Sequence, residues 1–234
     1  MLYKTTMNIY ETKAVQKYIV KKDNPSFKNT AIELNSRILI VGASGSGKTN
    51  TLAQYLMNSN NTFNTIHVCY KDTEPIYQAM GDQLGDKIKF YTNPADIPPL
   101  KDIRKDNKGK QNETDNILLI IDDWVNEAHK FPNLGDIFIR GRKFITTIFI
   151  TQSYFKVPKT WRSQLTYIIL LKLSSDKDLR LVLSDYSLGL DINELQQMYK
   201  KSTAEKFHFF KLDINASDAN RKYSHNFLDF YKVE

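Results

Sequence analysis

The chain contains one cysteine, Cys69, so no intrachain disulfide can form and a reducing compartment is expected. No run of residues reaches the ~18 apolar positions that a membrane-spanning helix needs, and the N-terminal residues lack the apolar core of a signal peptide. The four histidines are scattered, and neither an internal repeat nor a cluster of metal-ligating side chains is visible. These absences predict a soluble, intracellular protein with no membrane partner.

Acidic residues are missing from one long stretch of the chain. Between Ile137 and Ser175 there is no Asp or Glu. The basic residues in this stretch account for the whole net charge of +7, and they are Arg140, Arg142, Lys143, Lys156, Lys159, Arg162 and Lys172. Such a stretch can bind nucleic-acid phosphates, reach the nucleotide of a neighbouring subunit, or form a solvated surface, and composition alone leaves all three open.

The length of 234 residues and the hydrophobic content of 41% suit one α/β domain, or one such domain with a small appendage. We expect a lead-in over 1–36 that packs on the core, an ATPase core over 37–213 and a tail over 214–234. The lead-in should contain a turn at 23–25 and a short strand over 30–34. Residues 101–116 read as an exposed loop, either a plain insertion or, less favoured, a loop that contacts DNA.

The most specific motif follows the apolar run at 37–41. Its spacing is G-x-x-x-x-G-K-[ST], that of a phosphate-binding loop between a strand and a helix, here expected over 50–57. Glycines allow the backbone N–H groups to turn inward around a phosphate, and the helix directs its positive end at the anion. The residues expected to bind the nucleotide are Gly42, Ala43, Ser44, Gly45, Ser46, Gly47, Lys48, Thr49 and Asn50. A chance turn of glycine and serine is the weaker alternative.

A second anchor is the aliphatic run at 117–121, followed by Asp122 and Asp123. Five consecutive aliphatics predict a central parallel strand covered on both faces, and open α/β sheets bind ligands at the carboxyl ends of such strands. Asp122 is expected to hold Mg²⁺ together with Thr49, and Asp123 to orient the attacking water. The alternative is that the two aspartates only cap a helix over 124–130.

A third strand is expected over 144–152, a run rich in β-branched and aromatic residues. Gln152 ends this strand and should emerge beside Asp122, where it could sense the γ-phosphate; the alternative is a loop amide bonded to backbone. Further strands are expected over 65–70, 87–91, 166–173 and 205–212, and helices over 74–80, 176–184 and 191–201. Together these elements predict an α/β fold with a mostly parallel central sheet flanked by helices.

Four segments together resemble one family. GASGSGKT at 42–49, ILLIIDD at 117–123, RGRK at 140–143 and ITTIFITQSYFKVPKTWR at 145–162 are similar to the viral genome-packaging ATPases of the FtsK–HerA superfamily, of the poxvirus, giant-virus and virophage kind. The resemblance spans about residues 36–185. It implies a three-layer, RecA-like P-loop NTPase of the ASCE type that uses ATP and Mg²⁺ and moves double-stranded DNA, without regard to sequence, into a preformed capsid.

The resemblance also implies an assembly and a set of catalytic roles. The subunits should form a homo-oligomeric ring, a pentamer or hexamer, that meets a capsid or portal-vertex protein in the host cytoplasm, the viral factory or the virion. Lys48, Asp123 and Gln152 would act within one subunit, and an arginine would reach the neighbouring site, with Arg142 as first choice. Arg140 and Arg162 are the reserves.

One departure and two rival functions qualify this assignment. The superfamily usually carries Asp-Glu where this chain has Asp122-Asp123, so the shorter carboxylate could act through a second water, and Glu127 is the fallback base. The rivals are a P-loop nucleotide or nucleoside kinase, and an NTP-gated assembly switch that does not hydrolyse its ligand. A nuclease is not expected, because no further carboxylate cluster follows the core.

Overall fold

The computed structural model describes residues 8–18, 22–103, 116–187 and 189–233. Its described strands form one sheet in the order β3-β2-β4-β5-β1-β6-β7-β8-β9. The first six are parallel, and β7, β8 and β9 continue the sheet in antiparallel fashion. The strands are β1 Arg37–Val41, β2 Thr65–Tyr70, β3 Ile88–Tyr91, β4 Ile117–Asp122, β5 Ile145–Thr151, β6 Tyr167–Leu170, β7 Phe210–Asp213, β8 Tyr223–His225 and β9 Asp229–Phe230.

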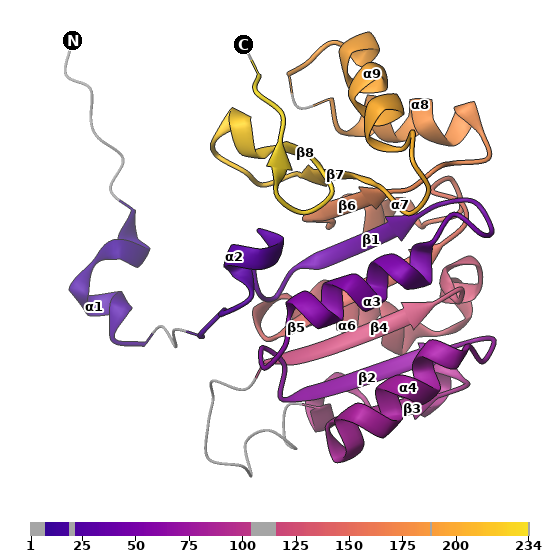
Figure 1. Ribbon diagram of the computed structural model, residues 1–234. Helices are drawn as coiled ribbons and strands as arrows, with labels where there is room; N and C mark the ends of the chain where they lie inside the picture. Colours follow the sequence, from indigo (N-terminus) through magenta and orange to yellow (C-terminus); the bar gives the residue numbers. More distant parts are fainter. Residues whose placement is uncertain (1–7, 19–21, 104–115, 188, 234) are drawn as a thin grey trace.

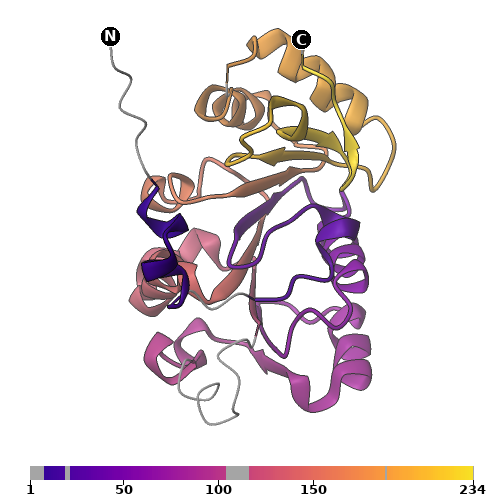
Figure 2. The ribbon, with the colours of Figure 1, turned by 90° about the vertical axis from the view of Figure 1, so that its left-hand side faces the viewer.

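Helices cover both faces of this sheet. In Figure 1 α3 and α4 lie in front of the strands and α6 behind them, and Figure 2 shows the sheet between these two helical layers. The α-helices are α1 Lys13–Gln16, α2 Phe27–Thr30, α3 Lys48–Asn58, α4 Pro75–Leu84, α6 Pro132–Arg140, α7 Lys159–Arg162, α8 Asp176–Asp185 and α9 Ile192–Ser202. The 3-10 helices are η1 Ile9–Glu11, η2 Gly85–Lys87, η3 Pro94–Asp96, η4 Val125–Lys130, η5 Gly141–Lys143 and η6 Ala219–Arg221. The three-layer, mostly parallel fold predicted from the sequence is confirmed.

The core is built by alternation along the central strands. In β4, Leu119 and Ile121 face the layer of α6, α8 and α9, whereas Leu118 and Ile120 face α3 and α4. All four side chains are at most 1% exposed. The run is aliphatic throughout because both of its faces are buried, and this confirms the prediction of a central strand covered on both sides.

The strand expected over 30–34 is wrong. Residues 27–30 form α2, and Ala31 follows in the left-handed region with φ 49°. The backbone beyond it bonds to side chains rather than to a neighbouring strand: Asn24 donates to the Ile32 carbonyl, and Tyr167 Oη accepts from the Glu33 N–H. The apolar alternation there serves packing, because Ile32 is buried without belonging to a strand.

Other boundaries differ more modestly from the expectation. The strand expected over 205–212 begins only at Phe210, because Phe207 takes φ 70° and turns the chain away from the sheet. The helix expected over 124–130 is the 3-10 helix η4, which begins at Val125. Of the expected loop at 101–116, residues 101–103 are helical, Asn116 is buried, and the remainder lies outside the described residues. In the tail, Tyr223 and Phe227 are buried against the core.

None of the helices in the described ranges is long and apolar enough to cross a membrane. The boundaries expected at 36/37 and 213/214 coincide with the start of β1 and the end of β7, within one continuous sheet. The division of the chain into lead-in, core and tail stays a prediction.

A buried lysine joins the lead-in and the tail to this sheet. Lys211 on β7 is 1% exposed, and its Nζ donates to the carbonyl oxygens of Thr30 at 3.0 Å and Phe227 at 2.6 Å. Its ammonium also lies 5.3 Å from the ring centre of Phe230. Burial lowers the pKa of Lys211 to about 7; Asp213 opposes this shift and Arg221 adds to it.

Replacing this lysine should change how stability depends on pH. Between about pH 7 and the ordinary lysine pKa of 10.5, the unfolded chain binds a proton that the folded chain has lost. The free energy of unfolding of the wild type should therefore rise with pH by up to about 1.4 kcal/mol per pH unit, relative to Lys211→Met. Denaturant unfolding from pH 7 to 9.5 measures this, with the exposed Lys232→Met as control; parallel curves for wild type and Lys211→Met would contradict it.

Candidate active site

The phosphate loop leaves β1 in the interior of the parallel sheet and enters α3. Its first residues are held on both sides, because the Gly42 N–H donates to the Thr151 carbonyl at 3.3 Å and the Ala43 N–H to the Lys172 carbonyl at 2.9 Å. Gly45 and Gly47 have φ 72° and 101°, a region that side chains other than glycine rarely adopt. The loop therefore turns sharply and presents the N-terminus of α3 toward the carboxyl edge of the sheet (Figure 1).

Lys48 is folded against this loop. Its Nζ donates to the carbonyl oxygens of Gly42 and Ala43, both at 3.1 Å. Burial lowers the pKa of Lys48, while the carboxylates of Asp123, Asp122 and, third, Glu74 oppose that change. The ammonium is thus pre-positioned among acidic groups where a phosphate would lie.

A cavity of about 420 Å³ opens in front of the loop. It brings together most of the site residues expected from the sequence, and the chain elements that supply them are the loop, α3 and the ends of β4 and β5. Its lining residues are Ser44, Gly45, Gly47, Lys48, Thr49, Asn50, Lys71, Asp72, Glu74, Asp122, Asp123, Gln152 and Phe207. Ala43 and Ser46 line a second cavity on the other side of the loop.

Asp122 ends β4 and is held by a tyrosine that the sequence analysis did not single out. Tyr77 Oη donates to Asp122 Oδ2 at 2.5 Å, and the Tyr77 ring stacks on Tyr70 with 4.9 Å between centroids. Burial raises the pKa of Asp122 to about 6; the hydrogen bond from Tyr77 opposes the rise, whereas Glu74 and Asp123 add to it. Tyr77 thereby fixes the orientation of the carboxylate.

The oxygen groups of Thr49 and Asp122 fit a magnesium ion that accompanies a nucleotide. Both residues line the same cavity, one from the start of α3 and one from the end of β4. Mg²⁺ takes oxygen ligands and usually keeps several waters and phosphate oxygens, so one hydroxyl and one carboxylate suffice. Within the described ranges no group of three or more His, Cys, Asp or Glu is placed to hold a metal ion.

Asp123 and Gln152 meet across the neighbouring strand ends. Gln152 Nε2 donates to Asp123 Oδ2 at 3.3 Å, because β5 lies directly beside β4 in the sheet. Asp123 has φ 60°, and its N–H donates to the Ile150 carbonyl at 3.1 Å. A left-handed aspartate costs of order 1 kcal/mol or more, and here it turns the carboxylate toward the cavity. The hydrogen-bond partner of Gln152 is therefore Asp123, whereas the sequence predicts that Gln152 lies beside Asp122.

Glu74 is a site residue that the sequence analysis missed. It lines the cavity from the N-terminus of α4, just after β2, and its charge acts on both Lys48 and Asp122. Since β2 lies directly beside β4, the rule that ligands bind at the carboxyl ends of parallel strands could have indicated it. Nothing local in the sequence distinguishes this glutamate from a helix-capping residue.

Glu127, the fallback base, does not line the cavity. Lys71 Nζ lies 2.6 Å from its Oε1 and Lys130 Nζ lies 3.1 Å from its Oε2. Hydrogen bonds from these two lysines lower the pKa of Glu127. The carboxylate is therefore an acceptor for surface lysines, and it is not directed at the phosphate loop.

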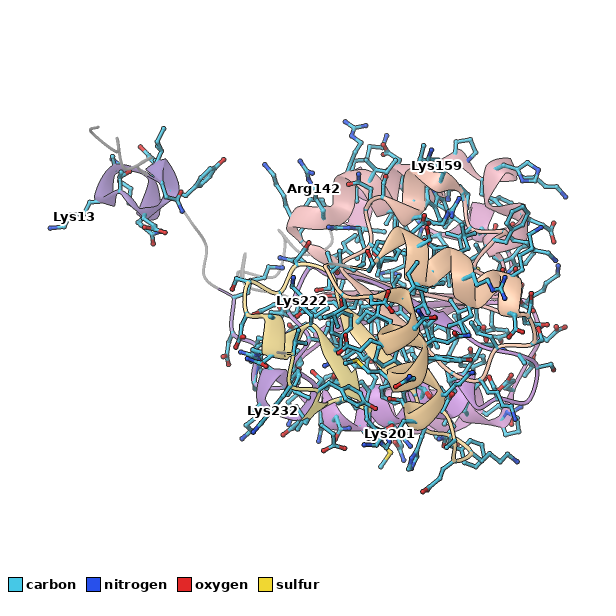
Figure 3. The ribbon with its side chains drawn as sticks, turned by 90° about the horizontal axis from the view of Figure 1, so that it is seen from above. Lys13, Arg142, Lys159, Lys201, Lys222 and Lys232 are labelled. Atoms are coloured by element: carbon cyan, nitrogen blue, oxygen red, sulfur yellow. The ribbon has the colours of Figure 1, made fainter. Side chains whose placement is uncertain are left out.

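The three candidate arginines lie outside the cavity of their own subunit. Arg142 is exposed on η5, at the end of β5 opposite to Gln152, and it lies on the surface of the molecule in Figure 3. Arg140 pairs with Asp136 at 2.9 Å, an exposed ion pair. Arg162 pairs with Asp185 at 2.9 Å and is half-buried, so its guanidinium is already engaged.

Two loop glycines provide a test of the loop geometry. An ideal Cβ on Gly47 would lie 2.5 Å from Phe207 Cδ1, whereas a Cβ on Gly45 would meet no atom within 4 Å. Gly45→Ala should lower the free energy of unfolding by about 1 kcal/mol through backbone strain alone, and Gly47→Ala by clearly more. Thermal unfolding without nucleotide measures both. In a Phe207→Ala background the cost of Gly47→Ala should fall to that of Gly45→Ala, and an unchanged cost would contradict the collision.

Comparison with solved structures identifies the same fold. B204, the DNA-packaging ATPase from Sulfolobus turreted icosahedral virus, is 15% identical with a TM-score of 0.57, over 83% of this chain and 98% of that one. The genome packaging NTPase B204 of Sulfolobus turreted icosahedral virus 2, in complex with AMPPCP, is 16% identical with a TM-score of 0.56 and the same coverage. The cytoplasmic domain of the type VII secretion ATPase EccC from Thermomonospora curvata is 13% identical with a TM-score of 0.53, over 85% of this chain and 26% of that one.

No curated protein sequence matches the chain. One family model does, and it covers the phosphate loop, Asp122, Asp123 and Gln152 together with the sheet that positions them: the model of the poxvirus A32 protein matches residues 26–209. With the P-loop NTPase fold established and most of the chain matched, the protein belongs to the poxvirus A32 protein family.

Proposed function

We propose that this chain is an ATPase that drives double-stranded DNA into a preformed viral capsid as a homo-oligomeric ring. The observation that carries the proposal is a phosphate loop facing Asp122, Asp123 and Gln152 across one cavity, in a member of the poxvirus A32 family. Its fold neighbour B204 is a DNA-packaging ATPase, and that activity is extended to this chain as part of the proposal.

The proposed reaction is phosphoryl transfer from ATP to water. Loop N–H groups and the Lys48 ammonium bind the phosphates, and Thr49 and Asp122 hold Mg²⁺, which neutralises charge on the β- and γ-phosphates when it is bound. A water oxygen forms a bond to the γ-phosphorus while the bond to the β–γ bridging oxygen breaks and ADP leaves. Asp123 orients this water and accepts its proton, and Gln152 holds the Asp123 carboxylate in place.

Glu74 is the second carboxylate that could serve the water. It reaches the cavity from α4, on the far side of Asp122 from β5 in strand order. The side chain of Glu74 is longer than that of Asp123. It therefore compensates for the short reach of Asp123 in this chain, which carries Asp-Asp at the end of β4. We assign the principal role to Asp123 because Gln152 already orients it, and a supporting role to Glu74.

Hydrolysis in this proposal depends on assembly. Arg142 precedes the seven-residue strand β5, and Gln152 follows it, so the two lie about 20 Å apart along the strand. Arg142 therefore cannot reach the phosphates of its own subunit and could serve only those of a neighbour. Arginines supplied in this way raise phosphoryl-transfer rates by ~10³–10⁵ in related NTPases.

Grip on DNA would also require several subunits. The cationic residues labelled in Figure 3 are spread over different parts of the molecule and do not form one stripe. Exposed Lys143 and Lys159 come from the stretch without acidic residues, and a ring would bring their copies around one channel. Contacts of this kind are made to phosphates, so binding should be insensitive to DNA sequence and should weaken steeply with salt.

Carboxylate variants test the chemistry. Asp123→Asn should lower kcat for ATP by at least ~10²-fold, Glu74→Gln by less, and Lys48→Ala should abolish turnover. Glu127→Gln is the matched control, since its carboxylate lies outside the cavity, and it should retain wild-type turnover. Steady-state phosphate release measures all four. A wild-type rate for Asp123→Asn would contradict the assignment of Asp123 as the residue that orients the attacking water and accepts its proton.

Mixing experiments test the assembly. Turnover should rise steeply with protein concentration and with added duplex DNA, and Arg142→Ala should regain activity when mixed with Asp123→Asn, because mixed interfaces pair an intact arginine with an intact site. Lack of rescue would remove Arg142 from this role. Turnover that ignores concentration and DNA but requires a nucleoside or nucleotide acceptor would instead identify a kinase, and binding without turnover would identify an assembly switch.

A further inference from the structure

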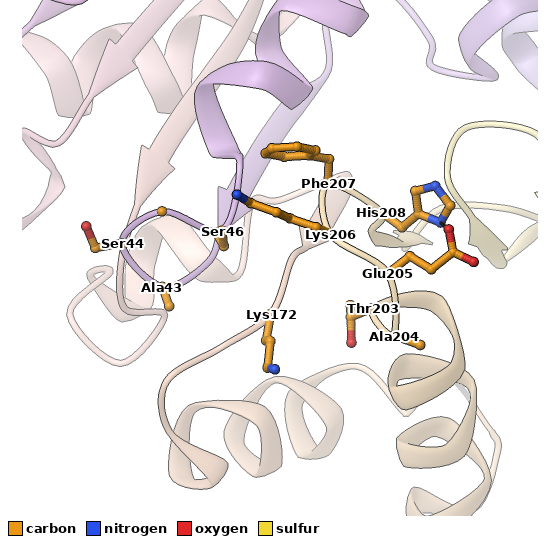
Figure 4. Close-up of a pocket in the computed structure, with 11 residues that line it drawn as sticks. Ala43, Ser44, Ser46, Lys172, Thr203, Ala204, Glu205, Lys206, Phe207 and His208 are labelled. Carbon is orange, nitrogen blue, oxygen red and sulfur yellow. Dashed lines mark ion pairs between the residues drawn. The ribbon is translucent and has the colours of Figure 1, made fainter.

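A second cavity, of about 290 Å³, adjoins the phosphate loop on the side opposite to Asp122 and Asp123. It is bounded by the loop, by Lys172 after β6 and by the turn 203–208 between α9 and β7 (Figure 4). Ser44, Gly45 and Phe207 line both this cavity and the phosphate cavity, so the two cavities adjoin each other at the loop.

The strand order of the sheet defines the side of the phosphate loop on which this cavity lies. In the sequence β4-β5-β1-β6-β7, the loop follows β1, with the carboxylates on the β4 and β5 side and the second cavity on the β6 and β7 side. Under the proposed function, on which this inference rests, the γ-phosphate points toward Asp123. The other end of the nucleotide, its ribose and base, must then leave the loop toward the turn 203–208.

This turn presents an aromatic ring at the point where the two cavities meet. Phe207 is 41% exposed, and it has φ 70°, a conformation that costs of order 1 kcal/mol or more for a residue other than glycine. One part of its ring packs on Gly47, which has no side chain to block it. The exposed part of the Phe207 ring is thus an aromatic surface at the place where the linings of the two cavities meet, and a planar ligand that enters either cavity can stack on it.

The turn itself is anchored, so the ring is held in place. His208 Nδ1 lies 3.0 Å from His225 Nε2 on β8, and Asn226 Oδ1 accepts from the Phe209 N–H at 3.3 Å. Lys206 extends toward the phosphate loop in Figure 4, with its Nζ 4.8 Å from the centre of the Phe207 ring. The site therefore combines a preformed stacking surface with a cation beside the place where phosphates bind.

We propose that Phe207 is the stacking platform for the base of the bound nucleotide, and that the cavity lined by Lys172 and the turn 203–208 receives its nucleoside part. Stacking on an aromatic face tolerates every base, because every base has a π-face. ATP and GTP should therefore bind with similar affinities, and specificity would come from hydrolysis and assembly.

Calorimetric titration of the full chain with ATP, GTP and inorganic tripolyphosphate tests this assignment. Phe207→Ala should weaken binding of ATP and GTP by roughly 5- to 150-fold, the range for loss of one base–aromatic stack, and leave tripolyphosphate unchanged. Phe207→Tyr should retain wild-type affinities. Phe207→Leu keeps an apolar side chain near Gly47 without an aromatic face, and it should behave like Phe207→Ala.

The matched control is Phe155→Ala. Phe155 is 59% exposed, carries Lys177 Nζ 4.9 Å from its ring centre and lines neither cavity, so its loss should leave all three affinities unchanged. Equal weakening of ATP and tripolyphosphate by Phe207→Ala would mean that the ring only supports the phosphate loop and would overturn the inference. So would wild-type ATP affinity in Phe207→Ala or Phe207→Leu. Failure of the wild type to bind either ligand would overturn the proposed function as well.

Discussion

The insertion of β5 between β1 and β4 is the constraint on which the site depends. Parallel strands bring their carboxyl ends to one edge, and these three bring a phosphate loop, an aspartate pair and Gln152 to the same place. The contact between Gln152 and Asp123 exists only because their strands are adjacent and in register. On the other side of β4, the chain leaves β2 and enters α4, which supplies Glu74 at its N-terminus and the tyrosine that holds Asp122.

The electrostatics of the cavity follow from this convergence. Four acidic residues (Asp72, Glu74, Asp122 and Asp123) and two lysines (Lys48 and Lys71) line the cavity, and repulsion from Glu74 and Asp123 adds to burial in raising the pKa of Asp122. Such a site is unfavourable for a bare triphosphate and favourable for a triphosphate that carries a divalent cation. The carboxylates thus favour binding of the cation-bound triphosphate, which is the form of nucleotide that the proposed reaction requires.

The parts of the fold and of the site that a local sequence pattern determines could be predicted from the sequence. The aliphatic run before Asp122 and the glycine spacing before Lys48 predicted a strand and a loop that the structure contains. Glu74 could not be assigned locally, because it joins the site through the pairing of β2 with β4. Phe207 lies in a run whose aromatic content suggests a strand, and only its left-handed backbone and its contact with Gly47 remove it from the sheet.

The two backbone bonds that hold the start of the phosphate loop have a mechanical consequence. Their acceptors are the carbonyls of Thr151 and Lys172, and the residues that follow these carbonyls begin the connections to α7 and to α8. The start of the loop is thus hydrogen-bonded to the origins of two connecting segments. A displacement of the loop would change the length of both hydrogen bonds. The positions of the two segments are therefore coupled to each other through the loop.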